Sequence, residues 1–397
     1  MSKGPLIPGK DVVGIRDFYR GKTLLITGCT GYIGKMILEK IIRSCPDFEK
    51  AYVMIRKKKG MTLHERLQKE IFDSQMFKEC FYRSQDCKRI AYSKVVPIGG
   101  DIGQEGLGFD EETKAILASE VQVILSCAAN TMFTEPLTSI LKSNYRGPME
   151  LLKMAKTWSR CQVFTHVSTT ACGTHLPHNS VVPEEIYWPG DPDEIVDDIM
   201  GRDPAYVAAN EKKFLEPWDN PYVYSKSLVE RGIKKHHGDL KAIIVRPPIT
   251  SACYKEPMIG WLDGLHAVAI TAFPMVMGIK RNFFVGHGKH WVSPGDIVSN
   301  GIICAAAYCD AVPNEETRVV QTCVSHVSDV KWTEFGEAGS PYLAYNPTHV
   351  GVLEPGANMY ETTTALEIAE FLDQGLKLKV MRALASLPVV GSPDILK

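Results

Sequence analysis

The chain has 397 residues, of which 45% are hydrophobic, enough for one large α/β domain and a smaller second one. Its 45 Lys and Arg residues nearly balance its 46 Asp and Glu residues, and the net charge of −1 argues against a nucleic-acid partner. The 11 cysteines include no Cys-x-x-Cys pair, so we expect no metal site but reduced core thiols in an intracellular compartment, for example Cys127, Cys253 and Cys304.

A glycine turn near the start predicts a phosphate site. Residues 23–26 are a short apolar run typical of a buried strand, and residues 36–42 have apolar side chains at helical spacing. Between them, one glycine permits a tight turn, another lets the backbone approach a pyrophosphate, and a third lets the helix pack close to the strand. This order favours a dinucleotide site over a structural turn. The residues expected to contact the cofactor here are Thr27, Gly28, Thr30, Gly31, Tyr32, Ile33 and Gly34.

A basic cluster, residues 56–59, follows the second expected strand, residues 51–55. An acidic residue at this place would bind the ribose 2′-hydroxyl of NAD, whereas a basic cluster suits the 2′-phosphate of NADP. The plain alternative is a solvated basic loop. The position at the end of the strand favours NADPH, with Arg56 and Lys58 as its contacts.

The next strands carry further candidates to the same edge of the sheet. An amphipathic helix is expected over residues 62–80 and a third strand over residues 94–102, which ends near Asp101 and Ile102. Asp101 either reaches the adenine amino group or serves as a turn residue, and the pattern favours neither. After the fourth expected strand, residues 121–125, small residues let the cofactor lie across the sheet edge; these are Cys127, Ala128 and Ala129.

Two hydroxyl residues, Ser168 and Thr169, follow the fifth expected strand, residues 161–167. Open α/β sheets place their chemistry at this end of their strands. The long acidic segment 177–210 is interpreted as a flap over the site, because loops of that length in compact domains are usually functional or mobile.

The next expected helix begins at Pro221 and carries Tyr222 and Lys226, which are four residues apart and so face one side. A lysine ammonium beside a phenol favours the phenolate, so we expect Lys226 to lower the pKa of Tyr222 and to hold the nicotinamide ribose. Tyr224 is the rival phenol, but its spacing from Lys226 places it on another face.

Thr169 or Ser168 is expected to bind the substrate carbonyl oxygen, and the sequence leaves open which of them does so. Asn144, on the helix after the fourth strand, is expected to contact the cofactor and to hold a water that relays protons to Lys226. The sixth expected strand, 242–248, is stopped by prolines, and Pro248 completes the cofactor-facing residues.

Residues 254–279, after the sixth expected strand, are apolar and aromatic. The longest apolar stretch, 265–279, is too short for a confident transmembrane helix. The remaining expected elements are a helix at 292–307, a strand at 317–324 and a helix at 363–384.

With these motifs in order, the chain resembles the fatty acyl-CoA reductases of the extended short-chain dehydrogenase/reductase type, which have a male-sterility-like NAD-binding domain. The resemblance covers about residues 15–330. Its more specific part is Lys255-Glu256-Pro257 followed by Gly260-Trp261. The other matching stretches are Thr27-Gly28-x-x-Gly31-x-x-Gly34, His166-Val167-Ser168-Thr169, Tyr222-x-Tyr224-Ser225-Lys226 and Val245-Arg246-Pro247.

The resemblance implies a Rossmann-type doubly wound parallel sheet over residues 15–325, with a substrate-facing insertion at about 254–290, and a smaller, mainly helical substrate region over residues 326–397. It implies NADPH-dependent reduction of a long-chain fatty acyl-CoA thioester to the alcohol through the aldehyde, with release of CoA. Its members suggest a cytoplasmic location or a peripheral one on the endoplasmic reticulum or peroxisomal membrane. It makes residues 254–279 and the C-terminal helices the candidate acyl tunnel, with ordinary core of the second domain as an equal alternative for any single residue. It leaves the acyl chain length and the oligomeric state open.

Two departures and two alternatives accompany this interpretation. The stretch after Thr169 is one residue shorter than the family pattern, and the chain ends soon after the last expected helix. A hydroxysteroid dehydrogenase or sugar-nucleotide epimerase on the same fold is the enzymatic alternative, against which the Lys-Glu-Pro stretch argues. The second alternative is a catalytically inactive protein that senses NADP or serves as a scaffold. The intact pair Tyr222 and Lys226 argues against it.

Overall fold

The computed structural model describes residues 14–177, 180–264, 273–285, 291–314, 316–324, 331–346, 358–360 and 362–372. The chain divides into two units, each of which is discontinuous in sequence. The first comprises Met1–Gly264 with Val292–Cys323, and the second comprises Leu265–Trp291 with Val324–Lys397. All chemistry predicted from the motifs lies in the first unit.

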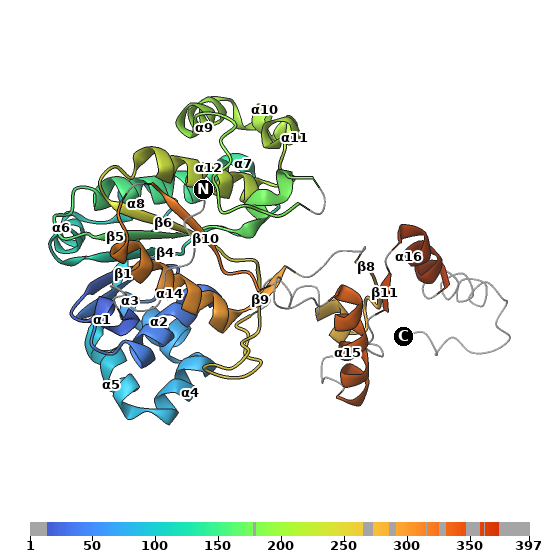
Figure 1. Cartoon of the computed structure of the whole chain (residues 1–397), viewed down its shortest axis with the longest axis horizontal. Coiled ribbons are helices and arrows are strands. Elements are labelled where there is room, and N and C mark those ends of the chain that lie inside the picture. Colours follow the sequence, from blue (N-terminus) through green and yellow to red (C-terminus); the bar gives the residue numbers. More distant parts are fainter. Residues whose placement is uncertain are drawn as a thin grey trace. The chain divides into compact units, whose positions relative to one another are not determined.

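The first unit is built on a parallel sheet of seven strands in the order β10-β6-β5-β4-β1-β2-β3 (Figure 1). The order reverses between β1 and β4, and such a switch point in an open parallel sheet is where a dinucleotide binds. The Rossmann-type fold expected from the sequence is therefore confirmed. The strands are β1 (Thr23–Thr27), β2 (Lys50–Ile55), β3 (Val95–Gly99), β4 (Val123–Ser126), β5 (Val163–Val167), β6 (Lys241–Arg246) and β10 (Arg318–Gln321).

Helices cover both faces of the sheet, which explains why its central strands are apolar throughout. On β1, Leu24 and Ile26 enter the core on one face and Leu25 enters the core on the other. In Figure 1, α2 and α14 lie on one side of the sheet, and α8 and α12 lie on the other. The main covering helices are α1 (Ile15–Tyr19), α2 (Tyr32–Ser44), α4 (Gln75–Arg83), α5 (Gln85–Lys94), α6 (Glu111–Glu120), α8 (Gly147–Ala155), α12 (Pro221–His236) and α14 (Gly295–Ala311).

Several expected elements have different bounds in the structure. The single helix expected at 62–80 is divided into α3 (Leu63–Arg66), a π-helical segment η1 (Leu67–Phe72) and α4. The Ser74 hydroxyl donates to the carbonyl oxygen of Ile71 (2.6 Å) at the break. Helix α5 was not expected; it begins where the Ser84 hydroxyl accepts the N–H of Cys87 (3.2 Å). The third strand ends earlier than expected, which leaves Asp101 in the following loop.

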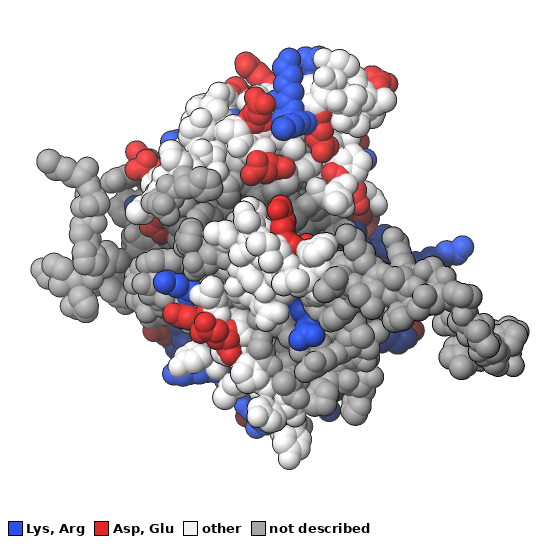
Figure 2. Space-filling model, turned by 90° about the vertical axis from the view of Figure 1, so that its right-hand side faces the viewer, with Lys and Arg blue, Asp and Glu red and all other residues white. Residues whose placement is uncertain are grey.

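The flap expected at 177–210 contains regular structure. Helices α9 (Pro192–Gly201) and α10 (Pro204–Ala209) each begin with proline after an aspartate whose carboxylate accepts main-chain N–H groups. The aspartates Asp191 and Asp203 therefore serve as helix caps. Acidic side chains are prominent at the top of Figure 2, the height at which Figure 1 draws α9 to α11 (α11, Glu211–Leu215).

The insertion expected at 254–290 does not form one substrate-facing element. Residues 254–264 belong to the first unit, whereas β8 (Asn282–Phe284) pairs in parallel with β11 (Asn358–Tyr360) in the second. The second unit also contains α15 (Trp332–Tyr345) and α16 (Thr363–Glu370); the rest of the helix expected at 363–384 lies beyond the described residues.

All eleven cysteines lie in the described residues as free thiols. Cys253 is buried and Cys127 half-buried, as core thiols should be, but Cys304, on α14, is exposed, so the expectation of a core thiol is wrong for this residue. Within the described ranges, the helices are too short or too polar to cross a membrane.

Candidate active site

The glycine turn joins β1 to α2, and its three glycines meet three different constraints. Gly28 has φ +79°, and a Cβ there would lie 2.9 Å from the main-chain nitrogen of Ala128. A Cβ on Gly34 would lie 2.3 Å from the carbonyl oxygen of Gly28, so α2 packs directly on the turn. A Cβ on Gly31 would meet nothing closer than 3.4 Å. Gly31 is exposed at the start of α2, so the protein itself leaves room there for a phosphate group.

Thr27 ties the turn to the neighbouring strand. Its buried hydroxyl accepts the N–H groups of Cys127 and Ala128, each at 3.0 Å. The switch point between β1 and β4 is therefore fixed by a side chain that the sequence assigned to cofactor contact. Cys127, Ala128 and the following Ala129 are half-buried at this edge.

The other side chains of the turn divide into two kinds. Thr30 and Ile33 are half-buried, whereas Tyr32 is buried and its hydroxyl donates to the carbonyl oxygen of Ser251 (2.9 Å). The Tyr32 ring also packs on Trp261 with ring centres 5.3 Å apart. Because the Tyr32 side chain is engaged in these contacts, the part of this residue that can bind a phosphate group is its main-chain N–H at the start of α2.

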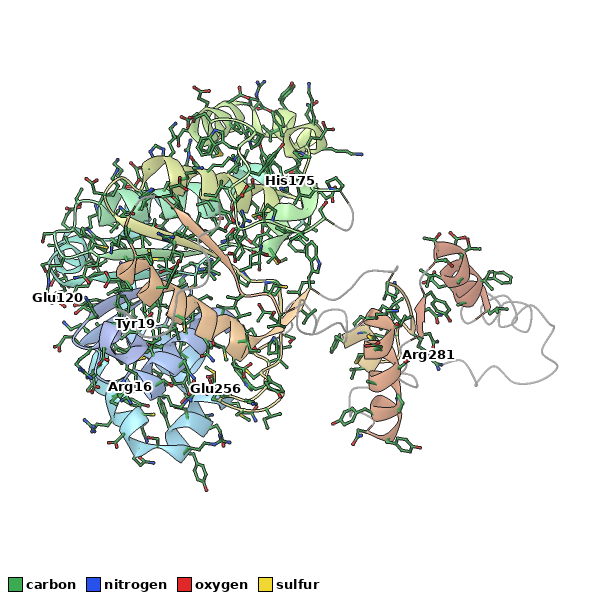
Figure 3. All side chains as sticks on the ribbon, viewed as in Figure 1. Arg16, Tyr19, Glu120, His175, Glu256 and Arg281 are labelled. Atoms are coloured by element: carbon green, nitrogen blue, oxygen red, sulfur yellow. The ribbon has the colours of Figure 1, made fainter. Side chains whose placement is uncertain are left out.

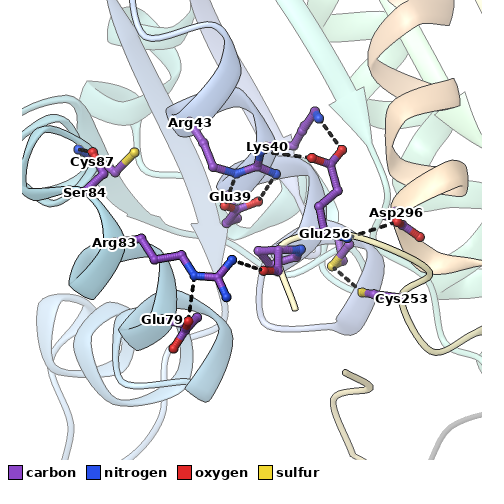
Figure 4. Close-up of polar contacts among 12 residues, drawn as sticks. Glu39, Lys40, Arg43, Glu79, Arg83, Ser84, Cys87, Cys253, Glu256 and Asp296 are labelled. Carbon is purple, nitrogen blue, oxygen red and sulfur yellow. Dashed lines mark hydrogen bonds and ion pairs between the residues drawn. The ribbon is translucent and has the colours of Figure 1, made fainter. Parts of the chain in front are cut away.

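Residues 254–264 form a loop clamped to α2, α4 and α14 (Figure 4), with the Arg83 guanidinium of α4 donating to the carbonyl oxygen of Pro257 (3.0 Å). The Asp296 carboxylate accepts the N–H groups of Tyr254 (2.9 Å) and Lys255 (2.8 Å), and Glu256 pairs with Lys40 and with Arg43 (3.0 Å). Burial alone would raise the pKa of Glu256, but its hydrogen bonds and the nearby cations lower that pKa to about 2. This part of the expected acyl tunnel is thus a polar clamp, and residues 265–272 lie outside the described residues.

The predicted contacts for the adenosine half lie at the ends of β2 and β3. Arg56 and Lys58 are exposed, and the Arg66 guanidinium holds the carbonyl oxygen of Arg56. The Asp101 carboxylate accepts the N–H of Gly103 (2.9 Å), which stabilises a turn; a contact with adenine stays a prediction. Ile102 packs against the start of α8, where a Cβ on Gly147 would lie 2.3 Å from its carbonyl oxygen.

Tyr222 and Lys226 occupy the first turns of α12, which is capped by Asn220. Lys226 is buried, and its Nζ donates to the carbonyl oxygen of Val167 (2.6 Å), the last residue of β5. Burial lowers the pKa of Lys226 to about 8. Tyr222 packs against Phe133 with ring centres 5.6 Å apart, whereas Tyr224 packs against Trp218 on another face of the helix (5.4 Å).

The pKa of Tyr222 differs from our expectation. Burial, with a smaller contribution from Cys172, raises the pKa of the phenol above its ordinary value. The expected depression by Lys226 requires an ammonium that compensates for lost solvation, and at Tyr222 lost solvation is the larger effect. The phenol is therefore protonated at neutral pH.

Asn144 lies in a π-helical segment, η3 (Lys142–Arg146), and its side chain is committed to the protein. Its amide nitrogen donates to the carbonyl oxygen of Asn130 (2.9 Å) and to the Ser225 hydroxyl (3.1 Å), while its oxygen accepts the N–H of Asn130 (2.7 Å). Both amide hydrogens are used within the protein, so a relay water would have to donate to the amide oxygen. The side chain joins the loop after β4 to α12, and its role in a proton relay stays a prediction.

Ser168 and Thr169, which the sequence could not separate, have different surroundings. The Ser168 side chain is buried and its hydroxyl donates to Glu230 Oε1 (2.5 Å). The Thr169 hydroxyl is half-buried and accepts the N–H of Ala171 (3.2 Å). Among the described residues, no hydrogen-bond acceptor is found for the Thr169 hydroxyl proton. At the same edge the N–H of Thr170 donates to the Pro247 carbonyl oxygen (2.9 Å), next to the buried Pro248.

Sequence reasoning missed the ion pair between Glu230 and Arg246 and the exposed Phe133 beside Tyr222. Glu230 carried a signal, because it lies one helical turn after Lys226 just as Lys226 lies one turn after Tyr222. A cavity of about 200 Å³ lies next to the pair, between the flap and α12. His175, labelled in Figure 3, lines it and stacks on Tyr187 with ring centres 4.1 Å apart.

Known proteins share both the sequence pattern and the fold. The chain is 29% identical over 357 residues to rat fatty acyl-CoA reductase 1, which covers 89% of this chain and 68% of the rat protein. It is 30% identical over 325 residues to bovine fatty acyl-CoA reductase 2, which covers 81% of this chain and 61% of the bovine protein. The chain thus spans about two thirds of the length of these relatives.

Solved structures with a similar fold include reductase domains and an epimerase. The terminal R domain of the myxalamid biosynthetic pathway superposes with TM-score 0.62 at 19% identity, covering 91% of this chain and 78% of that domain. ADP-L-glycero-D-manno-heptose-6-epimerase from Helicobacter pylori gives TM-score 0.52 at 15% identity, covering 86% and 85%. The family model described as male sterility protein, an NAD-binding family, matches residues 26–302. The chain therefore belongs to the male sterility protein family, as its motifs predicted.

Proposed function

We propose that the protein reduces a long-chain fatty acyl-CoA thioester with NADPH, releases CoA, and reduces the aldehyde further to the fatty alcohol. The observation that supports this most is the contact of Lys226 with the end of β5, one helical turn from Tyr222. It puts a buried lysine at the end of β5, the strand next to β4, with a tyrosine one helical turn away on α12. The similarity to fatty acyl-CoA reductases supplies the substrate class.

The residues at the switch point fit a nicotinamide dinucleotide. The N-terminus of α2 and the open space at Gly31 would hold the pyrophosphate, and Arg56 and Lys58 would hold the 2′-phosphate. Lys226 would hold the nicotinamide ribose. When bound, NADPH supplies the hydride that reduces the thioester carbon.

The oxygen of the substrate carbonyl gains negative charge as it is reduced, and Thr169 and Tyr222 are the donors for it. Thr169 is favoured over Ser168 because the Ser168 hydroxyl already donates to Glu230. Tyr222 is protonated at neutral pH, so it can donate a hydrogen bond first and a proton afterwards. The nearby ammonium of Lys226 stabilises the phenolate that this transfer leaves.

From the family resemblance we propose that the second unit contributes to acyl binding and that any membrane association is peripheral, on the endoplasmic reticulum or peroxisome.

The direct test is to incubate the full chain with NADPH and palmitoyl-CoA while following NADPH absorbance and CoA thiol release. A sample without acyl-CoA corrects for the protein's own thiols, of which Cys304 is exposed. We expect two NADPH consumed for each CoA released, with hexadecanol as the product. Release of CoA with one NADPH would mean an aldehyde product, and NADPH consumption without CoA release would contradict thioester reduction.

A further inference from the structure

Helix α12 presents two side chains, Lys226 and Glu230, to the end of β5, and both lie in register with Tyr222 on the preceding turn. Tyr222, Lys226 and Glu230 are spaced by four residues and so lie along one face of the helix. Lys226 holds the carbonyl oxygen of Val167 (2.6 Å), and Glu230 accepts the hydroxyl of the next residue, Ser168 (2.5 Å). The helix thus holds two consecutive residues directly before Thr169.

Glu230 is itself held by Arg246 at the end of β6. Arg246 Nε donates to Glu230 Oε1 (2.8 Å) and Arg246 Nη2 donates to Glu230 Oε2 (2.6 Å), a bidentate arrangement that fixes the plane of the carboxylate. The side chains are only 3% and 2% exposed. Since the desolvation of two charges offsets most of their attraction, such a pair is a weak source of stability, and its value here lies in geometry.

The same guanidinium also reaches the flap. Its Nη1 donates to the carbonyl oxygen of Pro183 (2.9 Å) and its Nη2 donates to that of Glu185 (2.8 Å). The flap residues around them line the cavity beside the pair. Arg246, the last residue of β6, therefore contacts the flap directly. Through Glu230 it also contacts the strand end that carries Thr169.

We propose that Glu230, clamped by Arg246, is a positioning residue that sets the Thr169 hydroxyl through its hydrogen bond with Ser168. This inference rests on the proposed function, in which Thr169 binds the reacting oxygen. Glu230→Gln turns one carboxylate oxygen into an NH2 donor, which then faces either the Ser168 hydroxyl and Arg246 Nε or Arg246 Nη2. Because donor faces donor and Arg246 loses its charge partner, the strand end is free to shift. The interaction of Thr169 strengthens as charge develops, so the loss appears in kcat and leaves KM nearly unchanged.

A double-mutant cycle tests this in the full chain, with Glu230→Gln, Thr169→Val and the double variant assayed on palmitoyl-CoA. We expect kcat to fall about 10²-fold for Glu230→Gln, the typical effect of a small misplacement. It should fall about 10²–10³-fold for Thr169→Val, the effect of losing one oxyanion donor. If Glu230 acts through Thr169, the double variant is no slower than Thr169→Val, and each variant binds NADPH as the wild type does.

Two further variants make the outcome decisive. Glu39→Gln removes another buried carboxylate paired with an arginine, Arg43, on α2 (2.6 Å), and should lower the Tm while kcat stays unchanged. If Glu230→Gln does not fold, Ser168→Ala removes the same hydrogen bond with little change in volume, and the cycle is repeated with it. Additive losses in kcat, or a Thr169→Val variant with normal kcat, would overturn the inference. A wild type that turns over no acyl-CoA would instead overturn the proposed function.

Discussion

Lys226 places its ammonium on the main-chain carbonyl oxygen of Val167 at 2.6 Å, inside the protein and at the end of a central strand. Carbonyl dipoles solvate an ammonium less well than water does, so burial lowers the pKa of Lys226 to about 8. The residue predicted to hold the cofactor ribose therefore changes charge close to physiological pH.

A pH dependence of cofactor binding follows from that value. As pH rises through about 8, Lys226 loses its proton, and NADPH affinity should fall because a neutral amine is a weaker donor to the ribose. Fluorescence titration with NADPH between about pH 6.5 and 9.5 measures this. Lys226→Arg does not titrate in this range and should remove the inflection. An identical pH profile for both proteins would contradict the assignment.

The same pKa affects the free energy of unfolding, which should rise with pH, whereas NADPH affinity should fall. Below pH 8 the folded chain keeps a buried ammonium that the unfolded chain, with a lysine pKa of about 10.4, solvates better. Between these two pKa values the unfolded chain binds more protons, so the contribution of Lys226 to the free energy of unfolding rises with pH across this window. In the absence of cofactor, Lys226→Met should flatten that part of the stability profile.

The glycine turn allows stability and cofactor binding to be separated. Gly34→Ala should destabilise the fold, because its Cβ would lie 2.3 Å from the Gly28 carbonyl oxygen, whereas Gly31→Ala meets only an ordinary contact at 3.4 Å. We therefore expect Gly31→Ala to keep its Tm but to lose NADPH affinity. Gly201→Ala, inside α9 with nothing within 4 Å, is the control and should gain up to about 1 kcal/mol. Normal NADPH affinity in Gly31→Ala would move the pyrophosphate away from this turn.

The cofactor preference can be tested at the end of β2. Arg56→Ala should weaken NADPH binding by about 1–3 kcal/mol, the range for charge-assisted hydrogen bonds, and should leave NADH binding nearly unchanged. Arg89→Ala, which removes a 72% exposed arginine on α5, controls for net charge. Equal losses for both cofactors in Arg56→Ala would refute the preference for NADPH.

Local patterns were enough to predict the sheet, the glycine turn and the start of α12, whereas the roles of the site residues stay predictions. The spacing of Gly28, Gly31 and Gly34 between a strand and a helix specifies the turn, although the close approach to Gly28 comes from Ala128 on the loop after β4. The first turns of α12 were equally local, since Asn220 and Pro221 are a cap and a first helical residue. These are features that a few adjacent residues determine.

Features that depend on distant partners were not predictable in the same way. The Glu230 carboxylate is placed by Ser168 and Arg246, which lie 62 and 16 residues away along the chain. The loop 254–264 looked like acyl tunnel because it is rich in aromatic and apolar residues, yet Asp296 and Arg43 clamp it from other helices. The pKa of Tyr222 likewise depends on burial, which helix spacing does not reveal.

The identity of the proton donor is the sharpest test of the site, because α12 offers two tyrosines on different faces. Tyr222→Phe keeps the ring that packs against Phe133 but removes the proton, so its Tm and NADPH affinity should persist. Its turnover of acyl-CoA should fall about 10²–10⁴-fold, the usual range for general acid–base catalysis. Lys226→Ala should impair turnover and NADPH affinity together, since this residue serves both the phenol and the ribose.

Tyr224→Phe is the matched control, since it removes the same hydroxyl two residues away. The Tyr224 ring packs on Trp218 and is buried, so the change should leave turnover and Tm nearly unchanged. Steady-state kinetics and thermal unfolding of both variants settle the assignment. If the Tyr222→Phe variant were active and the Tyr224→Phe variant inactive, the catalytic tyrosine would lie on the other face of α12. The role of Lys226, which depends on the face shared with Tyr222, would then have to be abandoned as well.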